Sequence, residues 1–323
     1  MVPKSRKIRV AIIRCDLHAL WYAGLFAKHD PVLFRKRSNI CHYYFYNKNN
    51  PLKLAIPTVS GLALVKVWDQ DKTNAEEFAR IFSPKPLVCL SLDEACEDVD
   101  MVFLADSNTD GSCHLSLAMP SLKKGLPTFV DKPLSSNLKD AKEIVRLAKR
   151  HKAPLMSASL LSQVPEGQQL RSRFSEIEPI EFAIIRNPGI GLDGRIHGIS
   201  FAQNLFGPGV EWVESMGPNP LEYLHLHYPK SHRCLDVLIC HTRTPHCGLY
   251  CTIHSKRGLI HSPRIDDWRF IGGGVRILNL LKKMVRTRKP PISYESMLEL
   301  IKIVEAGKSA QKKGKRVRLK EVK

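Results

Sequence analysis

The chain has 323 residues, of which 43% are hydrophobic and 25% charged, so a wholly disordered polypeptide is excluded. Fifty Lys and Arg against 31 Asp and Glu give a formal net charge of +19, spread along the chain apart from a basic end at residues 312–323. This length suggests two domains, and no apolar stretch is long enough to span a membrane.

Charge and cysteine usage indicate the environment of the protein. A basic surface can attract nucleic acid or anionic lipid, but no helix-turn-helix, zinc-finger or RNA-binding aromatic motif accompanies it. We therefore expect no specific nucleic acid and no membrane as partner. The nine cysteines form no CxxC pair, and the N-terminus lacks the apolar region of a secretory signal, which predicts reduced thiols and a cytoplasmic protein.

The first half of the chain alternates strand-like and helix-like segments. Short, β-branched apolar runs predict buried strands at residues 8–13, 62–68, 100–105, 128–131 and 153–158. Apolar periodicity predicts helices at residues 73–82, 115–122 and 138–150. Thr73 is the expected N-cap of the first of these, with Glu76 completing a capping box. The alternation predicts an α/β fold with a doubly wound parallel sheet of Rossmann type.

The connection between the first two predicted strands, residues 25–61, is an unusually long insertion. It contains Tyr43, Tyr44, Phe45 and Tyr46, and this density of aromatic residues favours order over disorder. We expect a packed flap or a subunit contact.

The second half of the chain has a different pattern of predicted elements. Strand-like segments separated by Gly and Pro turns lie at residues 181–186, 222–228, 235–241 and 249–255. Helical periodicity returns at 275–285 and 297–306, and Val317 and Leu319 alternate with charges like a surface strand. We therefore expect a dinucleotide-binding domain at residues 1–133 and an α+β substrate and oligomerisation domain at 134–323, with a large, mainly antiparallel sheet.

Ligands of a doubly wound sheet bind at the carboxyl ends of its strands. The candidate cofactor-binding residues at these ends are Arg14, Cys15, Asp16, His18, Asp69, Asp106, Ser107, Asn108, Asp131, Lys132 and Pro133. Asp69 closes the second strand, where a carboxylate would hold the ribose hydroxyls of a dinucleotide and repel the extra phosphate of NADP. A simple turn aspartate is an equal alternative.

The first turn lacks the GxGxxG fingerprint, since no glycine occurs between Arg14 and Gly24. Asp16 would bring a negative charge close to phosphates unless Arg14 or His18 offsets it. A helix N-terminus still follows, so anion binding there stays open.

Two further segments contain candidate catalytic residues. Lys132 directly follows a predicted strand, where its ammonium could polarise a hydroxyl or carbonyl near a nicotinamide; a surface turn is the alternative. Asp193 and His197 are four residues apart at the start of a helical segment, so the carboxylate could fix the tautomer of the imidazole. A surface ion pair is the alternative there.

Other chemistries lack support in the sequence. The candidate metal-binding histidines are His225, His227, His232, His241 and His246. They show neither HExxH nor finger spacing, so we expect no metal. Serine-hydrolase and P-loop motifs are also missing from the sequence.

Together these segments resemble the family of glucose–fructose oxidoreductase, inositol dehydrogenase and rhizopine catabolism proteins (Gfo/Idh/MocA). The most specific stretch is residues 67–154, and the run from residue 287 to 319 resembles the family's usual ending. The resemblance implies a Rossmann domain, a second domain with a large, mainly antiparallel sheet, and a cofactor that is NAD, with NADP possible. It also implies oxidation or reduction of a hydroxyl of a sugar, polyol or related compound.

The resemblance assigns roles to individual residues. The family's catalytic lysine corresponds to Lys132 and its DxxxH pair to Asp193 and His197, while the histidine after the third loop corresponds to His114. These imply that His197 takes the hydroxyl proton, Lys132 stabilises the alkoxide and Asp193 orients the pair, all three meeting in a crevice between the domains.

The sequence also departs from the family pattern. The glycine fingerprint is replaced by Arg14, Cys15 and Asp16, Asp131 shortens the usual glutamate, and Ser200 stands at a common aspartate position. The insertion at 25–61 is atypical.

We therefore expect a divergent NAD(P)-dependent dehydrogenase acting on CH-OH groups of a carbohydrate-like small molecule. Members of the family tend to associate through the exposed sheet face of the second domain, which implies a homo-oligomer, dimer or tetramer. The alternative is a non-catalytic or redox-neutral relative, a sensor or scaffold with weakened cofactor binding.

Overall fold

The computed structural model describes residues 6–107, 110–189, 192–217, 221–229, 235–242 and 248–322. The chain forms two compact units, Met1–Ser157 with Gly274–Ser293, and Ala158–Gly273 with Tyr294–Lys323. The expected boundary at residue 133 falls inside the first unit. The reason is that β6 (Leu155–Met156) pairs in parallel with β5 (Thr128–Val130), which keeps the intervening helix α7 (Leu138–Arg150) on the same sheet.

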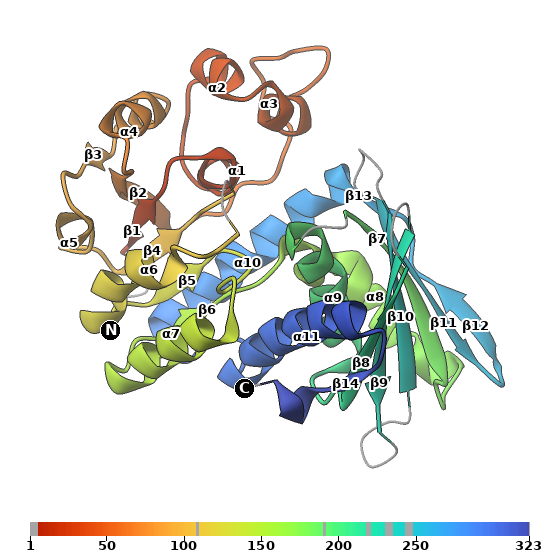
Figure 1. Cartoon of the computed structure of the whole chain (residues 1–323). Helices are drawn as coiled ribbons and strands as arrows, with labels where there is room; N and C mark the ends of the chain where they lie inside the picture. Colours follow the sequence, from red (N-terminus) through yellow and green to blue (C-terminus); the bar gives the residue numbers. More distant parts are fainter. Residues whose placement is uncertain are drawn as a thin grey trace. The chain divides into compact units, whose positions relative to one another are not determined.

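The first unit contains a six-stranded parallel sheet (Figure 1). Its strands are β1 (Ile8–Ile13), β2 (Leu62–Trp68), β3 (Leu87–Val88), β4 (Met101–Leu104), β5 and β6. Their order in the sheet is β3-β2-β1-β4-β5-β6, so the direction of winding reverses between β1 and β4. This is the doubly wound order that the sequence predicts, and it puts the ligand edge at the carboxyl ends of β1 and β4.

The helices of the first unit alternate with these strands. They are α1 (Leu17–Gly24), α4 (Lys72–Ala79), α5 (Leu92–Ala95), α6 (His114–Lys123), α7 and the C-terminal part of α10 (Asp267–Thr287). In α7 the predicted apolar stripe is buried. The prediction that Thr73 is the N-cap of α4 is wrong. The N-cap is Asp71, whose carboxylate accepts from the Thr73 N–H at 2.9 Å, so the helix begins at Lys72.

The insertion is ordered, as the sequence predicts. It forms two short helices, α2 (Pro31–Arg37) and α3 (Asn39–Phe45), drawn in red and orange in Figure 1. Phe34 and Phe45 stack with ring centroids 5.6 Å apart, and Trp21 of α1 packs on Phe45 at 4.8 Å. This aromatic cluster fastens the insertion to the first helix of the unit.

The second unit is a mixed sheet in the order β12-β11-β7-β10-β9-β8-β14. Its strands are β7 (Phe182–Pro188), β8 (Trp212–Met216), β9 (Leu221–Tyr228), β10 (Leu235–Thr242), β11 (Gly248–Ser255), β12 (Gly258–His261) and β14 (Val317–Arg318), and β13 (Ile265–Asp266) pairs with β11. All neighbours are antiparallel except β7 and β10. The mainly antiparallel second sheet is therefore confirmed, while β8, β12 and β13 are strands that the sequence did not reveal.

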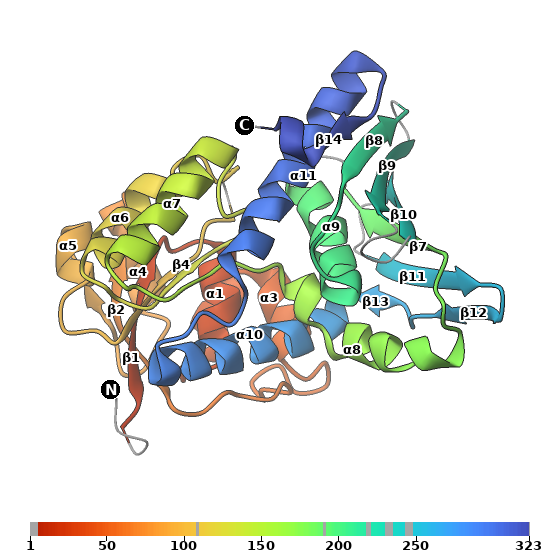
Figure 2. The ribbon, with the colours of Figure 1, turned by 90° about the horizontal axis from the view of Figure 1, so that it is seen from below.

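Helices cover one face of this second sheet. Figure 2 shows α9 (Leu192–Phe206) and α11 (Tyr294–Lys313) on the same side of the strands. The side chains beneath them alternate along the strands with outward ones, as in Leu224 and Leu226 of β9 and Val237 and Ile239 of β10. The remaining elements are α8 (Pro165–Ser172), η1 (Leu160–Gln163), η2 (Phe174–Glu176) and η3 (Leu319–Glu321). Within the described ranges, no helix combines the length and apolar character of a membrane span.

Candidate active site

The first turn keeps a left-handed bend without a glycine. Arg14 has φ of 69°, a conformation that normally favours glycine and costs another residue about 1 kcal/mol. Its N–H donates to the Trp68 carbonyl at 2.8 Å, and its guanidinium lies 3.9 Å from the Asp69 carboxylate. The bend of a nucleotide-binding turn is therefore present, although the glycine fingerprint is missing.

Asp16 occupies the N-terminus of α1. Its Oδ1 accepts from the His18 N–H at 2.9 Å and from the Ala19 N–H at 3.1 Å, and its Oδ2 accepts from the Ser107 N–H beyond β4. The residue is only 8% exposed, and burial raises the pKa of its carboxyl group although these hydrogen bonds oppose the shift. The positive end of the helix dipole thus already holds an anion.

Asp69, expected to face a ribose, is turned into the protein. Its Oδ2 accepts from the Cys15 N–H at 2.7 Å and from Asn74 Nδ2 at 2.9 Å, while its Oδ1 accepts from the Asp71 N–H at 3.0 Å. The side chain is 7% exposed. In this arrangement Asp69 fixes the first turn, and its role in holding a ribose stays a prediction.

The loop after β4 is also polar and buried. Asp106 accepts from Cys113 Sγ at 3.2 Å and lies 3.6 Å from His114 Nε2. The Asp106 N–H donates to Asp131 Oδ2 at 3.3 Å, which joins this loop to the one after β5. The third predicted residue of the loop, Asn108, lies outside the described residues.

A buried ion pair holds the loop that contains Lys132. His18 Nδ1 pairs with Asp131 Oδ2, and Asp131 is 1% exposed. Burial alone would raise the pKa of Asp131, but the His18 imidazolium beside it holds that pKa below its usual value. Burial alone would likewise lower the pKa of His18, and the Asp131 carboxylate raises it. Each partner therefore favours the charged form of the other.

The main chain around Lys132 is held on both sides. Its N–H donates to Asp131 Oδ1 at 2.8 Å, and the bond from Lys132 to Pro133 is cis. His114, which is fully buried, donates from Nδ1 to the Pro133 carbonyl at 2.9 Å. Lys132 is therefore a half-exposed residue of a loop at the carboxyl end of β5, and hydrogen bonds hold the main chain of this loop.

His197 lies in the second unit, on α9. Its Nδ1 is 2.6 Å from Ser159 Oγ, and Ser159 itself is buried and accepts from the Leu161 N–H at 3.2 Å. The sequence analysis missed Ser159; its place just before the short η1 helix is the capping signal that could have found it. Asp193 also lies on α9, but its side chain is outside the described residues, so its pairing with His197 stays a prediction.

The other histidines of the second unit that the structure describes are paired or packed. His225 Nε2 and His227 Nδ1 both lie 2.8 Å from Asp236 Oδ1, and His241 receives a hydrogen bond from Asn187 Nδ2 at 2.9 Å. Burial, followed by the charge of Arg195, lowers the pKa of His241 to about 4. His232 and His246 lie outside the described residues. In the part of the chain that the structure covers, no three His, Cys, Asp or Glu side chains are arranged to hold a metal.

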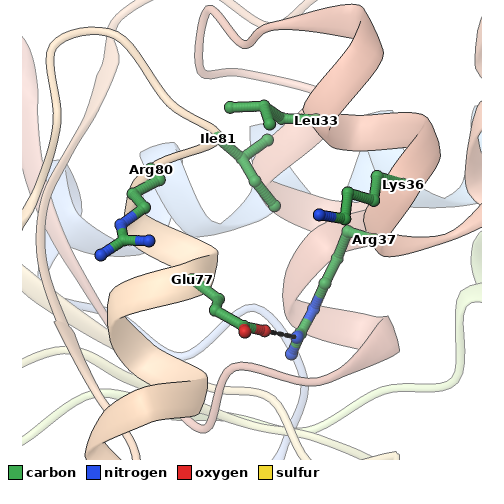
Figure 3. A pocket seen from close by; sticks show the side chains of 6 residues that line it. All are labelled: Leu33, Lys36, Arg37, Glu77, Arg80 and Ile81. Atoms are coloured by element: carbon green, nitrogen blue, oxygen red, sulfur yellow. Dashed lines mark hydrogen bonds and ion pairs between the residues drawn. The ribbon is translucent and has the colours of Figure 1, made fainter.

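A small surface pocket of 260 Å³ lies between α2 and α4 (Figure 3). It is lined by Leu33, Lys36, Arg37, Glu77, Arg80 and Ile81, none of which is a predicted site residue. Figure 3 shows Arg37 and Glu77 pointing toward one another, with Arg37 Nη1 and Glu77 Oε2 3.3 Å apart. Arg37 Nη2 also donates to the Cys15 carbonyl at 2.7 Å and to Asn74 Oδ1, so this pocket borders the first turn.

Comparison with known proteins agrees with this geometry. Residues 45–159 match the Gfo/Idh/MocA family, described as an oxidoreductase family with an NAD-binding Rossmann fold. The uncharacterized protein YMR315W of Saccharomyces cerevisiae is 25% identical over 118 residues, which are 36% of this chain and 34% of the yeast protein. The match thus spans about a third of that relative's length.

Solved structures resemble the chain over nearly its full length. A probable dehydrogenase from Thermotoga maritima has a TM-score of 0.76 at 17% identity, covering 98% of this chain and 100% of its own. A myo-inositol 2-dehydrogenase from Lactobacillus plantarum has a TM-score of 0.74 at 13% identity, covering 97% and 99%. GenD2 from gentamicin A biosynthesis, solved with NAD, has a TM-score of 0.75 at 12% identity, covering 98% and 99%. At these identities the likeness shows the fold.

The strand order of the first sheet and the family match of residues 45–159 define the first unit as an NAD-binding Rossmann fold. The match of residues 45–159 to the Gfo/Idh/MocA family agrees with the resemblance seen in the sequence, and the fold of the whole chain is shared with solved dehydrogenase structures.

The residues of this edge fit a dinucleotide under one condition. The guanidinium Nε of Arg14 is buried at the first turn and has no hydrogen-bond partner in the described chain. This donor is available to a phosphate oxygen. Asp16 does not fit, because its carboxylate occupies the helix N-terminus where a pyrophosphate normally lies. A dinucleotide therefore fits only after this carboxylate has moved away.

Proposed function

We propose that the chain is an NAD(P)-dependent oxidoreductase that interconverts a secondary hydroxyl and a ketone on a sugar, polyol or related compound. The observation that carries this proposal is the rigid loop of Lys132, fixed by His18 on one side and His114 on the other. Such a loop holds an ammonium at the ligand edge of the sheet. The family match of residues 45–159 and the fold shared with an inositol dehydrogenase support the same class of reaction.

Each of the three candidate catalytic residues has a distinct role in the proposed reaction. A bound nicotinamide would supply or accept the hydride. His197 takes the hydroxyl proton, and the contact of its Nδ1 with Ser159 Oγ orients the imidazole. Lys132 stabilises the negative charge that develops on the oxygen, and Asp193 orients and charge-balances the pair.

The residues proposed to bind the cofactor are those at the strand ends. Arg14, Asp106, Ser107 and Lys132 provide donors and acceptors along this edge. We propose NAD, with NADP as the alternative. The position of Asp69 in the sequence suggested that its carboxylate repels the extra phosphate of NADP. The structure weakens this argument, because the carboxylate accepts hydrogen bonds from Cys15 and Asn74.

A second candidate is a redox-neutral or non-catalytic relative, a sensor or scaffold. The observation in its favour is the presence of two carboxylates, Asp16 and Asp69, on backbone N–H groups of the first turn. For either candidate we propose a cytoplasmic protein with a small carbohydrate-like ligand. We also propose that it forms a homo-oligomer through the exposed face of the second sheet.

Substitution of the candidate catalytic residues tests the leading proposal. We expect Lys132→Ala and His197→Ala each to lower turnover of a responsive polyol about 10²- to 10⁴-fold. Lys139→Ala and His261→Ala, at exposed positions, serve as matched controls that retain activity. Circular dichroism checks that all four variants fold, and full activity of both catalytic variants would reject the assignment.

A thermal-shift series with NAD⁺, NADH, NADP⁺ and NADPH separates the two candidates. A dinucleotide that binds the native state raises the melting temperature as its concentration increases. Stabilisation by one of the four supports the oxidoreductase. The absence of any shift would favour the non-catalytic relative.

A further inference from the structure

The carboxylate of Asp16 gathers backbone donors from two distant segments. Two of them, the N–H groups of His18 and Ala19, belong to the first turn of α1. The third, the Ser107 N–H, follows β4, the strand next to β1 at the point where the winding reverses. An anion bridging these two segments lies at the switch point of the sheet, where this fold binds the phosphates of a dinucleotide.

We propose that Asp16 is an internal substitute for the cofactor's pyrophosphate and sets the affinity of the chain for dinucleotides. The inference rests on the proposed function, because it assumes that a dinucleotide is the ligand of this edge. The N–H groups that would bind a phosphate oxygen bind Asp16 in its place. Since two anions cannot share these donors, the cofactor binds only by displacing the carboxylate.

The surroundings of Asp16 make this displacement costly. The three hydrogen bonds have a charged acceptor in a site that is mostly shielded from water, and such bonds are the stronger kind. The second carboxylate, Asp69, takes the Cys15 N–H in the same turn, so a displaced Asp16 cannot move to that donor. The buried Nε of Arg14 is the cationic donor left for a phosphate.

This arrangement gives the missing glycines a functional consequence. A glycine fingerprint exposes bare backbone N–H groups to the pyrophosphate, whereas here the same groups are covered by a side chain of the chain itself. The chain is thereby a weak binder of dinucleotides that gains affinity when Asp16 loses its charge.

Asp16→Asn and Asp16→Ser test the inference, since Asn and Ser both remain good N-caps without the negative charge. We expect either variant to bind NADH and ADP-ribose about 10- to 100-fold more tightly than the unaltered chain, measured by isothermal titration calorimetry. Asp30→Asn is the matched control. Asp30 caps α2 in the same way, accepting from Val32 and Leu33 N–H groups at 2.8 and 2.9 Å, and its substitution should leave the affinity unchanged.

The outcomes separate this inference from the proposed function. Tighter binding by the Asp16 variants alone supports the inference, and if the unaltered chain binds nothing detectable, the same result also counts against its being a dehydrogenase. Binding by the unaltered chain that is equal to or tighter than that of both variants overturns the inference and leaves the proposed function standing. Failure of the chain and of both folded variants to bind any dinucleotide overturns both.

Discussion

At the scale of single residues, the His18–Asp131 pair connects the first turn to the loop of Lys132. Asp131 pairs with the imidazole of His18 and accepts hydrogen bonds from the Lys132 and Asp106 N–H groups. One carboxylate thus joins three loops at the strand ends. Removing one partner of a buried ion pair leaves the other without compensation, which typically costs about 3–5 kcal/mol. The pair is therefore a stabilising element as well as a support for the site.

The stability of the pair depends on pH in a defined direction. The folded pKa of His18 lies above its model value of 6.5, so its contribution is complete below pH 6.5 and is lost as the pH rises through the folded pKa. The folded pKa of Asp131 lies below 3.8, so its contribution is complete above pH 3.8 and is lost as the pH falls. The pair therefore stabilises the fold most between these two values.

We expect Asp131→Asn to lower the free energy of unfolding by about 3 kcal/mol at a pH near 6, and by less at a pH above the raised folded pKa of His18, where the imidazole loses its charge. Urea unfolding at the two pH values measures both differences. Asp93→Asn, at a side chain that is 74% exposed, is the control and should change neither. An equal loss at both pH values would contradict the charged pair.

The sequence located these residues but not their partners. Strand ends can be predicted because buried apolar runs stop where polar residues begin, and this identified Asp69, Asp106 and Asp131. The direction in which Asp69 points depends on Cys15 and Asn74, which no local pattern links to it. The contact of Ser159 with His197 likewise joins residues 38 positions apart.

At the scale of elements, the insertion at residues 25–61 depends on tertiary packing. Its helices α2 and α3 have seven residues each, too short to be stable alone in water. Caps at Asp30 and Ser38 and the burial of Phe34 and Phe45 stabilise them in place. Aromatic density predicted order here, whereas the helices depend on tertiary packing and gave no long periodic signal.

Arg37 fastens this insertion to the first turn. Its guanidinium donates to the Cys15 carbonyl and to Asn74, and it pairs with Glu77 of α4. We expect Arg37→Ala to lower the free energy of unfolding by about 1–3 kcal/mol, because the buried Cys15 carbonyl loses a charged donor. Arg35→Ala removes an exposed arginine of the same helix and is the control. Guanidinium chloride unfolding of both variants provides the comparison, and equal midpoints would show that Arg37 does not stabilise the insertion.

At the scale of the whole molecule, the chain passes between its two units three times. Residues 274–293 return to the first unit after the second has begun, and α10 contributes residues to both. The sequence correctly indicated two folds in succession, a parallel sheet and then a mainly antiparallel one. A single division at residue 133 does not represent this, because β6 still pairs with β5 beyond that point and residues 274–293 return to the first unit.

The second sheet has an uncovered face with large apolar side chains. Phe182 and Ile184 of β7 and Tyr250 of the adjacent β11 are exposed, and Phe182 stacks on His254 with ring centroids 4.3 Å apart. Exposed large apolar side chains on two adjacent strands are a feature of interaction surfaces. It supports the proposal that the chain associates with further copies of itself through this face.

Ile184→Arg tests that association, because a charge in an apolar interface is costly to desolvate. We expect the unaltered chain to have the mass of a dimer or tetramer and the variant that of a monomer, measured by size-exclusion chromatography with light scattering. Leu90→Arg, at a residue that is 76% exposed in the first unit, introduces the same charge elsewhere and should leave the mass unchanged. A monomeric unaltered chain, or a variant that still assembles, would show that this face does not mediate self-association.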